Sequence, residues 1–183
     1  MPLPQVVELL QAHFGKQKTP KLKGPWEMIL WENVAYLADD DRRQQAFQTL
    51  KKRIGTEPAK ILSASDEALL EVTRHGIMPE QFAYKLRNCA KIALEEFGGD
   101  LRPLLKLPLA ESKKALKQFP GIGGPGAEKI LLFTSTHSIF ALESNGLRVL
   151  LRRGSERRRK ATPRLTGLCN GLAAKGSKKT TTG

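Results

Sequence analysis

Residues 116–130, with the sequence LKQFPGIGGPGAEKI, constrain the fold more than any other stretch of the chain. A tight Gly-Ile-Gly turn separates two segments that favour helix. Glycine at 121 and 123 allows backbone conformations closed to other residues and lets a ligand approach closely. Because Ile122 is apolar, we expect it to turn back and pack between the two helices. The second helix would then start with bare amides, where the helix dipole favours an anion.

An ordinary glycine-rich connection between helices would also fit the Gly-x-Gly pattern alone. The apolar positions on both sides narrow the choice, with Leu116 and Phe119 before the turn and Ala127 and Ile130 after it. This spacing resembles the helix-hairpin-helix motif, which grips a DNA backbone without reading its sequence. The resemblance therefore implies that the turn contacts phosphate.

Charge points to a polyanionic partner, because the 183 residues carry a formal net charge of +13 and a pI near 10.0. Residues 152–183 hold ten Lys/Arg and one acidic residue, whereas the other 151 residues hold 21 and 17. We predict an N-terminal helix and basic linker (1–24), a helical domain (25–151, hairpin 110–133) and a basic, disordered tail (152–183). Nucleic acid is the expected partner ahead of a membrane.

The two cysteines, Cys89 and Cys169, have no second Cys or His at metal-ligand spacing. We therefore expect no metal site and no disulfide framework, which fits a reducing compartment. No apolar run approaches the length of a membrane span, and the N-terminus is not a signal peptide. The expected state is a cytoplasmic monomer, nucleoid-associated if the source is bacterial, with no membrane partner.

The periodicity of apolar residues predicts an all-α fold, with no convincing alternating strand. Expected helices or helical turns cover 4–14, 25–38, 39–54, 57–62, 65–74, 79–97, 101–105, 110–119, 124–133 and 144–151. In the second of these, the buried stripe comprises Trp26, Ile29, Leu30, Val34 and Leu37. Glu32 and Asn33 interrupt it, so they either find partners, lie at an exposed helix edge, or face a cleft.

Residues 140–151 carry the second informative pattern. Ser144 can cap a helix that contains Leu147 and Val149, and Glu143 lies just before that helix start, where the dipole stabilises a carboxylate. Glu143 follows Gly123 by twenty positions.

Together, the helical order, the Phe-Pro-Gly-Ile-Gly hairpin and this acid resemble the helix-hairpin-helix (HhH-GPD) DNA glycosylases of the endonuclease III superfamily. The resemblance covers residues 25–151. It implies a helical lobe that binds double-stranded DNA, flips a damaged or mismatched base into a cleft and excises it in base-excision repair. The catalytic step would be hydrolysis of the N-glycosidic bond.

The resemblance also assigns candidate site residues. Glu143, within the sequence LESNGLRV, falls where the family has its essential aspartate. Its longer side chain displaces the carboxylate by about one carbon bond, which lowers the catalytic efficiency. Pro125 occupies the place of the lysine that makes some members lyases, so a monofunctional enzyme is implied. The four cysteines of the family's iron–sulfur loop are absent, so no cluster or other cofactor is expected. The expected DNA-binding residues are Asn33, near an inserted glutamine of the family, with Gly121, Ile122, Gly123, Gly126, Lys129 and Arg148.

Where the family continues with further helices, this chain turns basic and poor in apolar residues after Leu151. Either a basic tail raises non-specific DNA affinity through counterion release, or a frameshift or truncation follows residue 151, the reading that we favour. The function of the chain has alternatives as well. The chain is a glycosylase, or a catalytically impaired DNA-binding module, or, less in keeping with the hairpin, a helical scaffold whose tail binds RNA.

Overall fold

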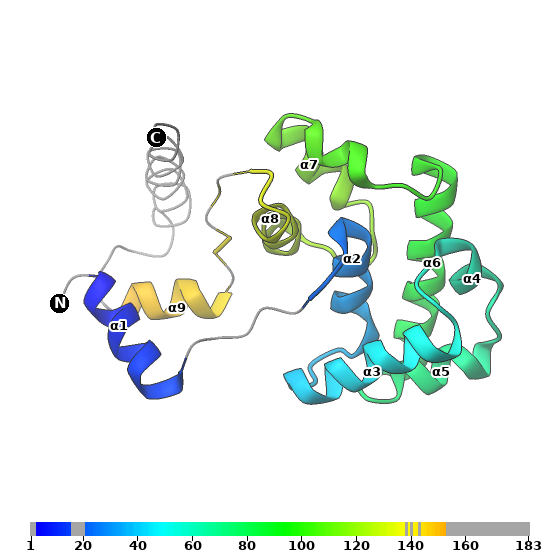
Figure 1. The fold of residues 1–183 in the computed structure, drawn as a ribbon, viewed down its shortest axis with the longest axis horizontal. Helices are drawn as coiled ribbons and strands as arrows, with labels where there is room; N and C mark the ends of the chain where they lie inside the picture. Colours follow the sequence, from blue (N-terminus) through cyan, green and yellow to red (C-terminus); the bar gives the residue numbers. More distant parts are fainter. Residues whose placement is uncertain (1–2, 16–20, 138, 140, 143, 153–183) are drawn as a thin grey trace, which may run out of the picture.

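The computed structural model describes residues 3–15, 21–137, 139, 141–142 and 144–152, and these are helical with no strand. The prediction of an all-α fold is confirmed (Figure 1). The elements are α1 (Leu3–Phe14), α2 (Gly24–Val34), α3 (Asp40–Arg53), α4 (Pro58–Ser63), α5 (Asp66–Thr73), α6 (Pro79–Phe97), a 3-10 helix η1 (Arg102–Lys106), α7 (Leu109–Leu116), α8 (Gly124–Phe133) and α9 (Ser144–Arg152).

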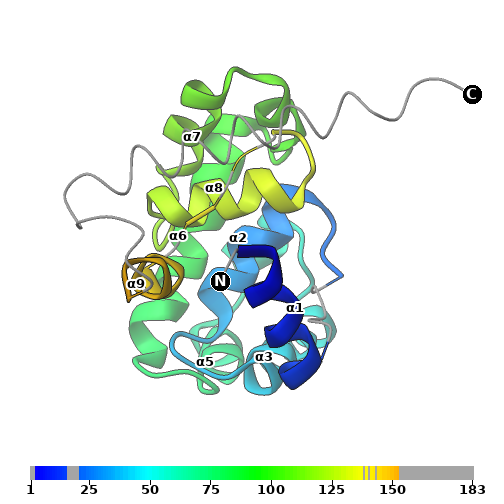
Figure 2. The ribbon, with the colours of Figure 1, turned by 90° about the vertical axis from the view of Figure 1, so that its left-hand side faces the viewer.

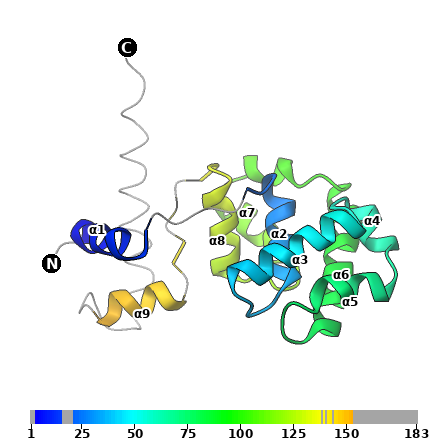
Figure 3. The ribbon, with the colours of Figure 1, turned by 60° about the horizontal axis from the view of Figure 1, so that its bottom comes forward.

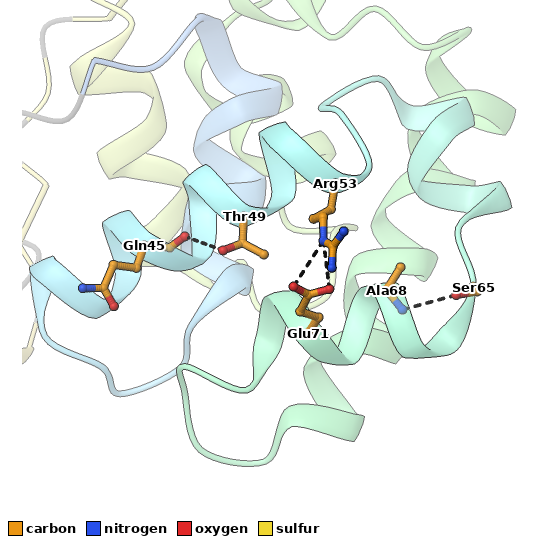
Figure 4. Close-up of polar contacts among 6 residues, drawn as sticks. All are labelled: Gln45, Thr49, Arg53, Ser65, Ala68 and Glu71. Carbon is orange, nitrogen blue, oxygen red and sulfur yellow. Dashed lines mark hydrogen bonds and ion pairs between the residues drawn. The ribbon is translucent and has the colours of Figure 1, made fainter.

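Local signals explain several of the helix boundaries. Asp39 caps α3 by accepting a hydrogen bond from the amide of Arg42 (2.8 Å), and Ser65 caps α5 by accepting one from Ala68 (3.2 Å). Proline stands in the first turn of α2, α4, α6 and α8, where its missing N–H costs no helical bond. The Arg53 guanidinium then ties α3 to Glu71 of α5, at 3.2 and 3.1 Å (Figure 4).

Helices α2 and α6 lie at the centre and contribute side chains to two apolar clusters. We call the first the hairpin core, because it joins α2 and α6 to η1, α7, α8 and the turn between them. The second, the three-helix core, joins α2 and α6 to α3, α4 and α5. Successive residues of α2 divide between them, with Ile29 in the hairpin core and Leu30 in the three-helix core. The position of the hairpin is thus set by the same helices that organise the rest of the fold.

Helices α1 and α9 lie apart from this helical body (Figures 1 and 3). Turning the molecule brings α9 to the front, with α8 crossing above α2 (Figure 2). Several large apolar side chains of α1 are exposed, namely Val7, Leu9, Leu10 and Phe14. Residues 153–183, to which the expectations about the tail apply, lie outside the described residues.

The end of α2 differs from its prediction. The helix stops at Val34 rather than continuing to Ala38, and Ala35 is already extended. Leu37, predicted to be in the buried stripe, is 71% exposed with φ +52°. The physical reason is the chain reversal into α3, since the capping role of Asp39 requires extended backbone there.

Candidate nucleic-acid interface

The turn between α7 and α8 has the geometry that its sequence predicts. Gly121 adopts φ +83°, a left-handed conformation that favours glycine, and the amide of Ile122 donates to the carbonyl of Phe119 at 3.0 Å. The Ile122 side chain points inward and is only 5% exposed within the hairpin core. The expected inward packing of Ile122 is confirmed, so only its backbone is available to a ligand.

The start of α8 presents unpaired backbone donors. Gly123 precedes the helix, and its carbonyl accepts the first helical bond, from Ala127 at 2.9 Å. Within the described part of the chain, the amides of Gly123, Gly124 and Gly126 have no hydrogen-bond acceptor. Gly123 is also exposed. These donors and the positive end of the helix dipole together form a place where an anion is stabilised.

Asn33 lies in the interior of the protein, whereas a residue that contacts DNA has to be at the surface. Its side chain is fully buried, and its Nδ2 donates to the carbonyls of Ile29 (3.0 Å) and Pro120 (3.1 Å). Asn33 was expected to contact DNA because it falls near the glutamine that the family inserts, but its side chain has no exposed surface in the described structure. Its polar partners, which the sequence pattern left open, belong to its own helix and to the hairpin.

Lys129 is engaged in the fold as well as being near the surface. Its ammonium pairs with the Glu32 carboxylate of α2 at 2.5 Å, with the Lys129 side chain 36% exposed. The two polar residues that interrupt the apolar stripe of α2 therefore both find partners, Glu32 on α8 and Asn33 on the turn before it. Lys129 remains close to the hairpin, but its charge is offset by Glu32.

The remaining candidates lie after α8. Glu143 falls outside the described residues. Arg148 is exposed on α9, which Figure 1 shows apart from the α7–α8 hairpin. Ser144, expected as a cap, is the first residue of α9. In the described conformation, the hairpin glycines thus gather at one turn, while Arg148 belongs to a separate element.

Two loops beside α2 expose apolar side chains that sequence reasoning missed. The amide of Ile77 donates to the carbonyl of Tyr36 at 3.1 Å, which joins the loop after α2 to the loop before α6. Gly76 makes this approach possible, since a Cβ there would lie 2.5 Å from the Tyr36 nitrogen. We call this pair of loops the apolar tip. It exposes Leu37 (71%), Ile77 (49%) and Met78 (50%).

One signal could have located the apolar tip. Asp39 is a good helix cap, so a helix that began after it left too little chain for α2 to continue through Leu37. Leu37 and Met78 both adopt positive φ, +52° and +58°. Such conformations are costly for large side chains and cluster at functional sites.

Exposed lysines at the end of α7 add positive charge beside the hairpin turn. Lys114 and Lys117 are exposed, and no carboxylate pairs with either among the residues described. By contrast, Lys113 is paired with Glu128 of α8 at 2.5 Å. Lys117 immediately follows α7 on the path into the turn. Sequence reasoning passed over these lysines because they lie on the polar face of a helix.

Cys89 lies beneath the hairpin and is not a reactive thiol. Its side chain is buried, and that burial raises its pKa to about 12, an effect slightly reduced by the charge of Lys85. Its Sγ lies 3.6 Å from the carbonyl oxygen of Pro120. In the described ranges, no three His, Cys, Asp or Glu side chains gather as a metal site requires, and no helix is long and apolar enough to cross a bilayer.

Comparison with solved structures shows which known fold the chain shares. The chain superposes on a non-covalent endonuclease III–DNA complex with TM-score 0.69 at 14% identity, covering 91% of this chain and 76% of that one. The chain has the endonuclease III fold. The fold prediction, an all-α structure of the helix-hairpin-helix glycosylase type, is confirmed by this superposition.

Two further structures share this fold. A trapped endonuclease III–DNA covalent intermediate with an estranged adenine gives TM-score 0.66 at 15% identity, over 86% of this chain and 72% of that one. A thermostable thymine-DNA glycosylase gives TM-score 0.69 at 13% identity, over 92% and 77%. No protein-family model and no curated protein match the sequence. At these identities the likeness establishes the endonuclease III fold, and activity has to be argued from the site.

Proposed function

We propose that this protein is a monofunctional DNA glycosylase that binds duplex DNA through the hairpin and hydrolyses the N-glycosidic bond of a damaged or mismatched base. The observation that carries the proposal is the exposed turn at Gly121–Gly126, where unpaired amides meet the positive end of α8. A backbone phosphate matches such donors, and they carry no information about base sequence.

The apolar tip supports the proposal that the protein distorts duplex DNA as well as binding it. Proteins that distort a duplex insert apolar side chains between base steps, which partly unstacks the bases. Leu37 and Ile77 are exposed on loops that adjoin each other and follow the end of α2. Because Asn33 in the last turn of α2 contacts Pro120, the tip and the hairpin lie at the same end of that helix. One duplex could therefore meet phosphate donors and an apolar wedge together.

The chemical step is assigned to Glu143 on its sequence position and the resemblance alone. Hydrolysis breaks the bond between the sugar C1′ and the base nitrogen, and water supplies the oxygen that replaces the base. A carboxylate beside the sugar stabilises the positive charge that develops as the base leaves, or accepts a proton from the attacking water. Pro125 has no amine, so it cannot form the Schiff base that strand cleavage requires.

The test is release of free base from duplexes that carry oxidised, alkylated, deaminated or mismatched bases. We expect release by the native chain, loss in Glu143→Gln, and duplex binding retained in that variant. A Glu143→Asp variant is the matched control, since it restores the family's side chain and should raise the rate. If no duplex in the panel loses a base with either carboxylate, the glycosylase proposal fails.

A second candidate function is a DNA-binding module without catalysis. The observation that favours it is the glutamate at position 143, whose longer arm misplaces the carboxylate, and an error of order 1 Å can cost about 100-fold in rate. This candidate predicts salt-dependent duplex binding that is unchanged in Glu143→Gln, with no base release from the native chain. The release assay separates the two functions.

A further inference from the structure

We propose that Asn33 is a positioning residue that locks the Pro120–Gly121 turn onto α2 and so holds the hairpin amides in the orientation that binds phosphate. The lock itself is a feature of the free protein. Its consequence for DNA rests on the function proposed above.

The hydrogen bonds of Asn33 join parts of the chain that are 87 positions apart. Its Nδ2 donates to the carbonyl of Ile29 in its own helix and to the carbonyl of Pro120 in the turn, with the Cys89 Sγ as a longer third contact at 3.9 Å. The Pro120 carbonyl has a second neighbour in the thiol of Cys89, at 3.6 Å. The amide group is fully buried beside Ile29 and Cys89 of the hairpin core. A polar side chain at such a place is costly unless its hydrogen bonds are made.

The other face of the same amide fits against Gly121. A Cβ at Gly121 would lie only 2.5 Å from Asn33 Oδ1, so this glycine leaves the space that the amide fills. Asn33 Oδ1 is buried and has no hydrogen-bond donor among the described residues. The amide is thus fixed against the turn by the hydrogen bonds of its Nδ2 and by the space that Gly121 leaves, which is more than packing alone requires. An apolar side chain of similar shape would make neither hydrogen bond.

The lock also sets where the apolar tip lies relative to the hairpin. Asn33 is in the last turn of α2, and Tyr36 and Leu37 follow directly. Since Asn33 is bonded to Pro120, movement of the turn relative to the end of α2 would break a buried hydrogen bond. The phosphate donors and the exposed side chain of Leu37 are therefore held in a fixed relation before any DNA binds.

Hydrogen exchange in the free protein tests the lock directly. The reporter is the amide of Ile122, bonded to Phe119, and the reference is the amide of Leu69, bonded to Ser65 in the three-helix core. Asn33→Leu keeps the branching and the number of side-chain heavy atoms, although leucine is bulkier, and it removes the Nδ2 donor group. We expect Ile122 to exchange about tenfold faster relative to Leu69 in this variant. If Asn33 only contributed to overall stability, its loss would speed exchange at both amides equally and leave the ratio of their exchange rates unchanged. That result would overturn the proposal.

The matched control is Ser112→Ala. Ser112 is also fully buried and polar, with its Oγ 2.7 Å from the carbonyl of Leu104 and 3.1 Å from that of Leu107, but it does not contact the turn. Its loss should leave the ratio of the Ile122 to the Leu69 exchange rate within about twofold of the native value, because the two hydrogen bonds that it removes join α7 to η1 and the loop after η1, away from the Gly121 turn. A change as large as that in Asn33→Leu would also count against a specific lock.

A double-mutant cycle tests the fit between Asn33 and Gly121. Gly121→Ala should raise the unfolding equilibrium constant less in an Asn33→Ala background than in the native background, because the shortened side chain no longer meets the new Cβ. If the stability changes of the two substitutions were additive, Asn33 and Gly121 would not be in contact. Both this cycle and the exchange experiment are read without DNA.

Duplex affinity then separates the lock from the proposed function. If the native chain binds, we expect Asn33→Leu to weaken binding about tenfold and Ser112→Ala by less than about twofold. Equal affinities of native and Asn33→Leu protein would overturn the positioning role while the proposed function stood. If the native chain does not bind duplex DNA, the proposed function fails, and the exchange ratio still decides whether Asn33 locks the turn.

Discussion

At the scale of single residues, Gly121 combines two separate requirements for glycine. Its φ of +83° is strained for any other residue, and the Asn33 oxygen occupies the place of a Cβ. Gly124, three positions on, has neither constraint, since no atom lies within 4 Å of a Cβ built there. The two glycines look alike in the sequence but differ in what the fold demands of them.

Gly121→Ala should therefore lower the free energy of unfolding by about 1–3 kcal/mol, from backbone strain and the clash with Asn33. Gly124→Ala is the control, and should change stability by less than about 0.5 kcal/mol, or raise it slightly, because alanine favours helix. Urea denaturation measures both. Equal effects of the two substitutions would show that Gly121 is not under the predicted constraint.

Cys89 provides a prediction from its pKa, which burial raises from 9.0 to about 12. The unfolded chain loses the thiol proton at lower pH than the folded protein, so this residue's contribution to stability falls as pH rises from about 9 to 12. In a Cys169→Ser background, we expect a thiol reagent at pH 8 to modify Cys89 only as fast as the protein opens. Rapid modification of the native fold would contradict this, and the reaction in urea provides the reference rate.

At the scale of elements, two polar connections attach the hairpin to α2: the Asn33–Pro120 hydrogen bond joins the turn, and the Glu32–Lys129 ion pair joins α8. The pair is partly exposed, so solvent screens it. Glu32→Gln and Lys129→Gln should each cost less than about 1 kcal/mol in stability, with a coupling energy of about 0.5 kcal/mol that shrinks in high salt. A double-mutant cycle in urea measures it, and full additivity at low salt would mean that the pair contributes nothing.

The apolar tip shows a conflict between stability and proposed function. Leu37 is 71% exposed at φ +52°, so it gains little burial and carries backbone strain. Leu37→Asn should raise the free energy of unfolding by roughly 0.5–1 kcal/mol, because asparagine tolerates the left-handed conformation. The same change should reduce the fluorescence increase of a 2-aminopurine placed in the duplex.

The control for the apolar tip is Leu62→Gln, which removes another exposed apolar side chain, from α4. It should leave the 2-aminopurine signal as in the native protein. If Leu37→Asn leaves the duplex equally distorted, the wedge role is excluded even if stability rises.

At the scale of the whole molecule, charge and fold act on different aspects of binding. The net charge of +13 attracts any polyanion, whereas the hairpin places a few donors at one surface. We expect duplex affinity to fall steeply as the salt concentration rises. A plot of log affinity against log salt concentration has a slope of about −0.9 for each phosphate that the protein neutralises. A variant without residues 153–183 should therefore show a shallower slope. Fluorescence anisotropy across a salt series measures the slopes. Identical slopes would mean that residues 153–183 neutralise no phosphate.

The whole fold also explains why one hairpin can be held so firmly. Helices α2 and α6 belong to both apolar cores, so the hairpin core cannot open without disturbing helices that the three-helix core needs. Trp26 packs against both cores, and its indole N–H donates to the carbonyl of Thr56 at 2.6 Å. The hairpin is thus a surface feature built on central elements.

The sequence by itself determined the succession of helices and the turn between α7 and α8, but not the end of α2. Helix α6 spans Pro79–Phe97 and α8 spans Gly124–Phe133 as predicted, because apolar periodicity and an initiating proline act over a few residues. The glycines after Phe97 also act locally, by ending α6. The inward direction of Ile122 follows from the same local logic. Whether Glu143 is catalytic stays a prediction from sequence.

Only the tertiary structure decided the roles of the polar residues on α2 and the exposure of Leu37. Asn33 and Pro120 are 87 positions apart, and no periodicity connects them. Lys129 looks like a free surface cation until α2 brings Glu32 to it. Leu37 matched the apolar stripe, but the chain reversal before Asp39 turned it outward. Local patterns fix backbone conformation through short-range sterics and hydrogen bonds, whereas the partner of a side chain depends on which distant helix packs beside it.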